Sequence, residues 1–178
     1  MTISKPYLSL LISLTLATFG LTVAYVTGVM IIAPLLFALG IPLVNIDKPL
    51  KQKIGLTLVI MIVSVSVFIG TILAAIGFDF DKYIFPGLLV GLAGVAILGI
   101  NGLVIDTIKL NLKTILLTFI LSGISLPLWI FMTESIFPKT LSSSDLVRQF
   151  GVIMLWMTLT TIGICSAIKT ENRLTVKN

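Results

Sequence analysis

The residues that could take part in chemistry inside the apolar segments of this chain are few and uncharged. Asn45 and Asn101 carry amide groups, and Ser122 and Ser125 carry hydroxyls. Such groups can hydrogen-bond a neutral solute, or they can cap and join helices. We therefore treat these four residues as a candidate polar lining. The structural alternative is strongest for Ser125, which could stabilise a kink at Pro127.

Metal and redox chemistry have little support in the sequence. The chain holds one cysteine, Cys165, and no histidine, which excludes an internal disulfide and the commonest metal ligand. Asp79 and Asp81 resemble a two-carboxylate fragment of a magnesium or calcium site, but carboxylates beside Lys82 are more typical of a solvated turn. We expect no catalytic residue, no cofactor and no metal.

Composition indicates that lipid, and not water, surrounds this chain. Of its 178 residues, 57% are hydrophobic and only 11% are charged, whereas about a quarter are charged in soluble proteins. Mean hydropathy is +1.18. The net charge of +5 comes from short clusters between apolar runs and not from one patch, so we expect a lipid bilayer and no nucleic acid as partner.

Runs without charge define the expected membrane crossings, because about 20 apolar residues cross a hydrocarbon core of about 30 Å. Four crossings are expected at 54–77, 84–105, 114–132 and 144–168, the last beginning near Ser143. Residues 7–44 carry no charge and would extend about 57 Å as one helix. A hairpin that turns near Thr27 and Gly28 would give crossings at 7–26 and 29–44.

Two alternatives to this hairpin remain. Pro34, Gly40 and Pro42 would suit one crossing followed by a re-entrant or interfacial helix. A cleaved signal peptide is the other, although the segment Thr22–Ala24 is a poor cleavage site.

The distribution of basic residues favours six crossings. With six, one side of the membrane receives nine of the twelve basic residues: Lys5, Lys48, Lys51, Lys53, Lys109, Lys113, Lys169, Arg173 and Lys177. A five-crossing topology moves only Lys5 to the other side. Because basic loops stay in the cytoplasm, we expect an integral protein of a bacterial cytoplasmic membrane with both termini inside the cell.

Aromatic residues gather near the expected outer ends of the crossings. This pattern predicts an interfacial belt, and a groove for a lipid tail or quinone is the alternative. The residues are Tyr25, Phe78, Phe80, Tyr83, Phe85, Trp129, Phe131, Phe137 and Phe150.

Small residues recur at helical spacing in three of the crossings. Small side chains let two helix backbones approach closely, which is how helices associate in lipid. The pattern predicts packing within the chain, with contact between identical chains as the alternative. The candidate packing residues are Ala17, Gly20, Ala24 and Gly28, then Ser66, Gly70 and Ala74, then Gly87, Gly91 and Gly94.

Together these features predict an all-α, polytopic transmembrane helical bundle over residues 1–178, a single domain with six crossings, or five. The leading hypothesis for its function is a non-enzymatic accessory, assembly or scaffold subunit that acts through helix packing with itself or another membrane protein. A small transporter or channel for a neutral or lipophilic solute is the alternative. A lipid-modifying membrane enzyme has the least support.

Overall fold

A computed structural model describes residues 4–76, 84–137 and 145–169, and this part of the chain is almost entirely helical. The expected all-α fold is confirmed. The helices are α1 (Lys5–Thr27), α2 (Ile32–Asn45), α3 (Leu50–Ile76), α4 (Ile84–Val104), α5 (Leu112–Phe131), the π-helical turn η1 (Met132–Ile136) and α7 (Asp145–Ala167).

Five of the described helices, α1, α3, α4, α5 with η1, and α7, are long and apolar enough to cross a membrane. Helix α2 has 14 residues and spans about 21 Å, which is less than a hydrocarbon core of about 30 Å. The chain is therefore a membrane-embedded bundle of five long apolar helices and one short one.

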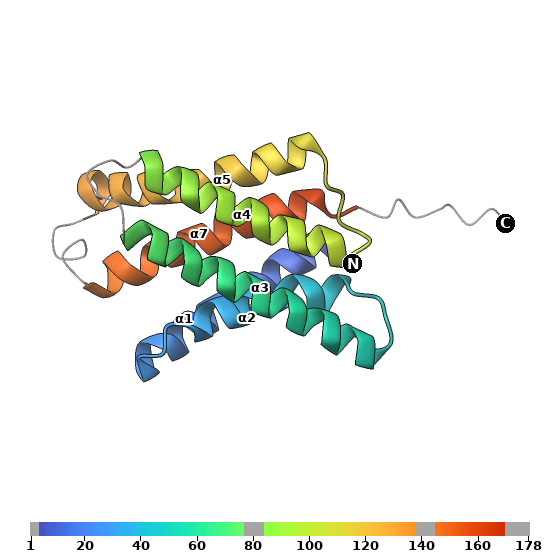
Figure 1. The fold of residues 1–178 in the computed structure, drawn as a ribbon. Coiled ribbons are helices and arrows are strands. Elements are labelled where there is room, and N and C mark those ends of the chain that lie inside the picture. The colour runs from blue at the N-terminus through green and yellow to red at the C-terminus, as the bar shows by residue number, and fades with distance from the viewer. Residues whose placement is uncertain (1–3, 77–83, 138–144, 170–178) are drawn as a thin grey trace.

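The helices form a ring in chain order. Each helix packs against the next, and α7 packs against both α5 and α1, which closes the ring (Figure 1). The start of α1, loops 46–49 and 105–111, and Lys169 lie at one end of the bundle, which we call the basic end. The turn at residues 28–31 lies at the opposite end (Figure 1).

The turn between α1 and α2 lies at the position expected from Thr27 and Gly28. Gly28 adopts a left-handed conformation with φ of 74°, and its N–H donates to the Ala24 carbonyl over 2.8 Å. Thr27 Oγ1 donates to the Val23 carbonyl, which satisfies a second group at this helix end. A glycine without Cβ tolerates this backbone at no steric cost.

From this turn, α2 runs back along α1 to the basic end. The last residue of α2, Asn45, donates from Nδ2 to Ser9 Oγ over 2.7 Å. Ser9 lies one turn from the start of α1. Thus α2, although short, returns the chain nearly to the level at which α1 begins.

Backbone hydrogen bonds join two segments at the basic end. Lys109 N–H donates to the Ala167 carbonyl and Lys169 N–H donates to the Thr107 carbonyl, each over 2.9 Å. Between them, Ile108 pairs with Ile168 in an isolated β-bridge. These bonds hold the α4–α5 loop against the end of α7.

The described starts of α1, α2, α3 and α5 differ by two to four residues from the ranges expected from the apolar runs, and α3 differs most. Helix α3 begins at Leu50 and not at residue 54, so its first turn includes charged Lys51 and Lys53. Lysine tolerates this position because its long stem can carry the ammonium group back toward the interface, and Lys53 Nζ donates to the Leu43 carbonyl. The expected start of the last helix near Ser143 lies outside the described residues.

Candidate ligand-binding site

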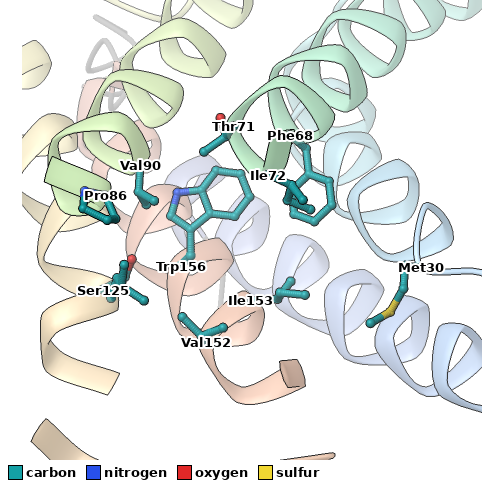
Figure 2. A pocket seen from close by; sticks show the side chains of 11 residues that line it. Met30, Phe68, Thr71, Ile72, Pro86, Val90, Ser125, Val152, Ile153 and Trp156 are labelled. Carbon is teal, nitrogen blue, oxygen red and sulfur yellow. The ribbon is translucent and has the colours of Figure 1, made fainter. Parts of the chain in front are cut away.

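An apolar cavity of about 430 Å³, open to the outside of the bundle, lies among α3, α4, α5 and α7, toward the end where the turn residue Met30 lies. Its volume falls within the range of small-molecule sites in proteins, about 300–1,000 Å³. Figure 2 shows side chains of several helices facing it, among them Phe68 and Ile72 of α3, Pro86 and Val90 of α4, and Ile153 and Trp156 of α7. Met30, from the α1–α2 turn, also contributes to the wall.

Trp156 is the central aromatic residue of this cavity. Its indole ring is only 6% exposed and stacks on the Phe68 ring, with centroids 5.6 Å apart and planes inclined by 26°. Figure 2 shows the ring nitrogen on the side of Val90 and Pro86. Among the described residues, no acceptor lies within hydrogen-bond distance of Nε1. The cavity wall thus contains a buried N–H donor without a protein partner.

The two hydroxyl groups of the wall already donate to their own helices. Thr71 Oγ1 donates to the Val67 carbonyl over 2.7 Å, and Ser125 Oγ donates to the Ser122 carbonyl over 2.6 Å. Bonds of this kind satisfy a hydroxyl at little cost within a helix. Among the described wall residues, the buried Trp156 N–H is therefore the donor that has no protein partner.

Aliphatic side chains fill the bundle between this cavity and the basic end. Ile60, Leu98, Met157 and Ile164 have at most traces of exposed surface. Nearer the basic end, Ile105 and the paired Ile108 and Ile168 are also buried. This packing closes the cavity on that side, so it has the shape of a blind pocket.

Comparison of the sequence and structure with family models, curated proteins and solved structures gives no match. The site is therefore interpreted from its own chemistry. Among the described residues, that chemistry is an apolar cavity of ligand size, one buried N–H donor without a partner and no ionisable side chain in the lining.

Of the four residues expected to form a polar lining, only Ser125 lines this cavity. Ser122 is fully buried between α5 and α7, where its Oγ lies 2.8 Å from Thr160 Oγ1. Asn45 joins α2 to α1, as described above. Asn101 donates from Nδ2 to the Ile97 carbonyl of its own helix, over 2.8 Å. The structure therefore distributes these polar groups over separate helix contacts.

The small residues of α4 lie at its contact with α5. A Cβ added to Gly91 would come within 2.9 Å of the Phe119 carbonyl oxygen, and one added to Gly87 within 3.0 Å of the Gly123 carbonyl oxygen. Gly94 faces the Ser122 side chain. At these glycines the two backbones approach too closely for any larger side chain, which sets the position of Ser125 and Pro86 in the cavity wall.

The small residues of α1 pack on α2. Ala17, Gly20 and Ala24 are buried, and a Cβ on Gly20 would lie 2.9 Å from the Ala33 Cα. Gly28 has a different place: it is exposed at the turn, with no atom within 4 Å of an added Cβ. Its left-handed backbone explains the glycine there.

The small residues of α3 face outward. Ser66 and Gly70 are exposed, Ala74 is partly exposed, and an added Cβ on Gly70 would meet no atom within 4 Å. No described helix of this chain covers this α3 surface at Gly70. Asp79 and Asp81, the weak metal candidates, lie outside the described residues.

Sequence reasoning missed Trp156 and Phe68, the aromatic pair of the cavity. A signal was present, because Trp156 falls within the last apolar run and not at its end, where interfacial tryptophans occur. A tryptophan well inside a hydrophobic helix must bury its N–H, and this indicates a polar partner.

Proposed function

We propose that this membrane protein binds an uncharged lipophilic molecule in the cavity beside Trp156, as a small carrier for a neutral or lipophilic solute. The observation that carries the proposal is an apolar cavity of about 430 Å³ within a membrane-embedded bundle. Ligand sites in proteins are typically concave, mostly apolar and of this size. An apolar cavity lined by side chains of four helices therefore favours an occupant.

The wall chemistry defines what such an occupant can be. An ion would lose its hydration without gaining a charged partner, because no lysine, arginine, aspartate or glutamate among the described residues lines the cavity. A lipophilic molecule loses no favourable solvation when it moves from the acyl chains of the bilayer into contact with this wall. The cavity therefore suits a solute that is already dissolved in the membrane.

The test is quenching of Trp156 fluorescence by bromododecane in the purified full-length chain, with Trp129→Phe so that Trp156 is the single tryptophan. We expect saturable quenching. Val90→Phe, which fills the cavity wall, should lower the affinity by at least tenfold. The matched control is Leu92→Phe, which adds a ring on the same helix at a position that is 58% exposed. Bromododecane should quench the Trp156 fluorescence of this variant with the same affinity as in the parent.

Quenching that rises without saturation, or is equal in the Val90→Phe and Leu92→Phe variants, would contradict binding in the cavity. Thermal melts of both variants establish that the bundle is intact. If Val90→Phe fails to fold, Ile153→Phe blocks the same cavity from α7.

A second candidate function, the accessory or scaffold subunit, is favoured by the outward face of α3. Ser66, Gly70 and Ala74 form a small-xxx-small pattern, which packs well against an identical helix. We propose a pair of identical chains that meet at α3. Chemical cross-linking in vesicles should then trap a dimer, and Gly70→Leu should reduce its yield several-fold. A parent chain that remains monomeric would refute this candidate.

A further inference from the structure

We infer that the indole N–H of Trp156 selects the ligand of this cavity, and that the ligand is a lipophilic molecule with an uncharged oxygen acceptor within its apolar body. A carbonyl or ether oxygen would serve. The inference rests on the proposed function, since it names the class of molecule that the same cavity binds. It depends on three observations: the unpaired donor, its depth in the bundle and the apolar surroundings.

The unpaired donor is the first observation. Trp156 is 94% buried, since its exposed fraction is 6%, and its Nε1 has no acceptor among the described residues. A buried N–H without a partner costs about 1–3 kcal/mol. An oxygen atom supplied by a ligand removes the cost once the indole ring or the neighbouring Val90 side chain turns to admit it, because Nε1 itself is buried. The Thr71 and Ser125 hydroxyls that share the wall donate to their own helices instead.

The depth of Trp156 is the second observation. It lies six residues inside the apolar span Phe150–Ala167, which is about 9 Å along the helix. Ester carbonyls of bilayer lipids stay near the boundary of the hydrocarbon core and do not serve a donor at this level. The acceptor must therefore belong to a molecule that dissolves in the acyl-chain region and carries its oxygen with it.

The apolar surroundings are the third observation. Acyl chains are as apolar as the wall residues Phe68, Ile72 and Val90, so the alkyl part of a ligand gives little preference for one lipophilic molecule over another. A hydrogen bond made in this environment has no competition from water. The hydrogen bond from the Trp156 N–H therefore determines which lipophilic molecule binds more tightly.

The experiment compares two probes with the same carbon skeleton, undecane and dipentyl ketone, which differ only in the central carbonyl. Each is measured in radiolabelled form on the detergent-solubilised full-length chain. We expect the ketone to bind about threefold to tenfold more tightly than undecane, which is the worth of one hydrogen bond. Trp156→Phe, which keeps an aromatic ring and removes the N–H, should make the two affinities equal.

A spectroscopic measurement separates recognition from a merely structural role of the ring. In ¹⁵N-labelled protein, the ketone should shift the indole N–H resonance of Trp156, whereas undecane should not. Trp129 provides the internal control, because it does not line the cavity.

The outcomes distinguish this inference from the proposed function. Equal affinity of the two probes in the parent chain, or a ketone preference that survives Trp156→Phe, refutes the role of the N–H while the cavity remains a binding site. Binding of neither probe, or binding that Val90→Phe leaves unchanged, refutes the proposed function itself. Stronger competition by phospholipid than by the ketone would identify a bilayer lipid as the occupant and overturn the depth argument.

Discussion

Gly91→Leu is expected to destabilise the bundle strongly, because an added side chain there meets the backbone of α5. A Cβ at Gly91 already lies 2.9 Å from the Phe119 carbonyl oxygen and 3.0 Å from its ring, and a leucine adds three more carbons. Since the obstacle includes backbone, α4 and α5 must separate. We expect a loss of about 3 kcal/mol or more and a thermal midpoint lower by roughly 10 °C.

The matched control is Gly99→Leu, the same chemical change on the same helix. An added Cβ at Gly99 meets no atom of the described residues within 4 Å, and Gly99 lies outside the α3 surface proposed to join two chains, so this variant should melt as the parent does. Circular dichroism melts of both variants in mild detergent provide the comparison. Equal midpoints for the two variants would show that α4 and α5 do not approach at Gly91.

The contrast between Gly91 and Gly70 also shows what the sequence can and cannot predict. Small residues at helical spacing occur in α1, α3 and α4 alike. The pattern indicates only that the backbone of another helix could approach at these positions. Which helix approaches depends on the closure of the whole ring. Thus Gly91 packs on α5, whereas a Cβ added to Gly70 of α3 meets no atom of the described residues within 4 Å.

The helices themselves were predictable, because a backbone in lipid must satisfy its own hydrogen bonds and apolar runs of about 20 residues have few other solutions. The hairpin turn was predictable for a local reason, the left-handed backbone that Gly28 adopts. The cavity was not. The cavity is the space left between Phe68, Val90 and Trp156 once α3, α4 and α7 are packed in place. The periodicity of apolar residues in the sequence holds no information about a space between helices.

Asn45 and Asn101 illustrate the same limit at the level of single side chains. The sequence marks both as amides that need partners inside apolar runs. Asn45 donates to Ser9 on the neighbouring helix and to Ile41 of its own helix, whereas Asn101 donates to its own helix. The Oδ1 atoms of both residues have no partner among the described residues. The difference arises from the geometry of the α1–α2 hairpin, which brings one pair of helices together along nearly their full length.

That hairpin leads to an all-or-none prediction about topology. In a Cys165→Ser background, single cysteines at Ser4, Val29, Asp47 and Asp106 can be labelled with a membrane-impermeant maleimide. Ser4, Asp47 and Asp106 should react from one face of the membrane, and Val29 only from the other. The reasons are the Asn45–Ser9 bond, which returns α2 to the start of α1, and the ion pair of 3.4 Å between Lys48 and Asp106, which joins two loops.

The side that reacts is a separate prediction, made from charge alone. Because loops rich in lysine stay in the cytoplasm, the three basic-end cysteines should label in inverted vesicles and not in intact cells. Labelling of Ser4 and Asp47 from opposite faces would instead support five crossings. Labelling of Val29 from the same face as Ser4 would mean that α1 turns back inside the membrane. In that case the cavity would no longer lie within a complete ring, since Met30 of the same turn forms part of its wall.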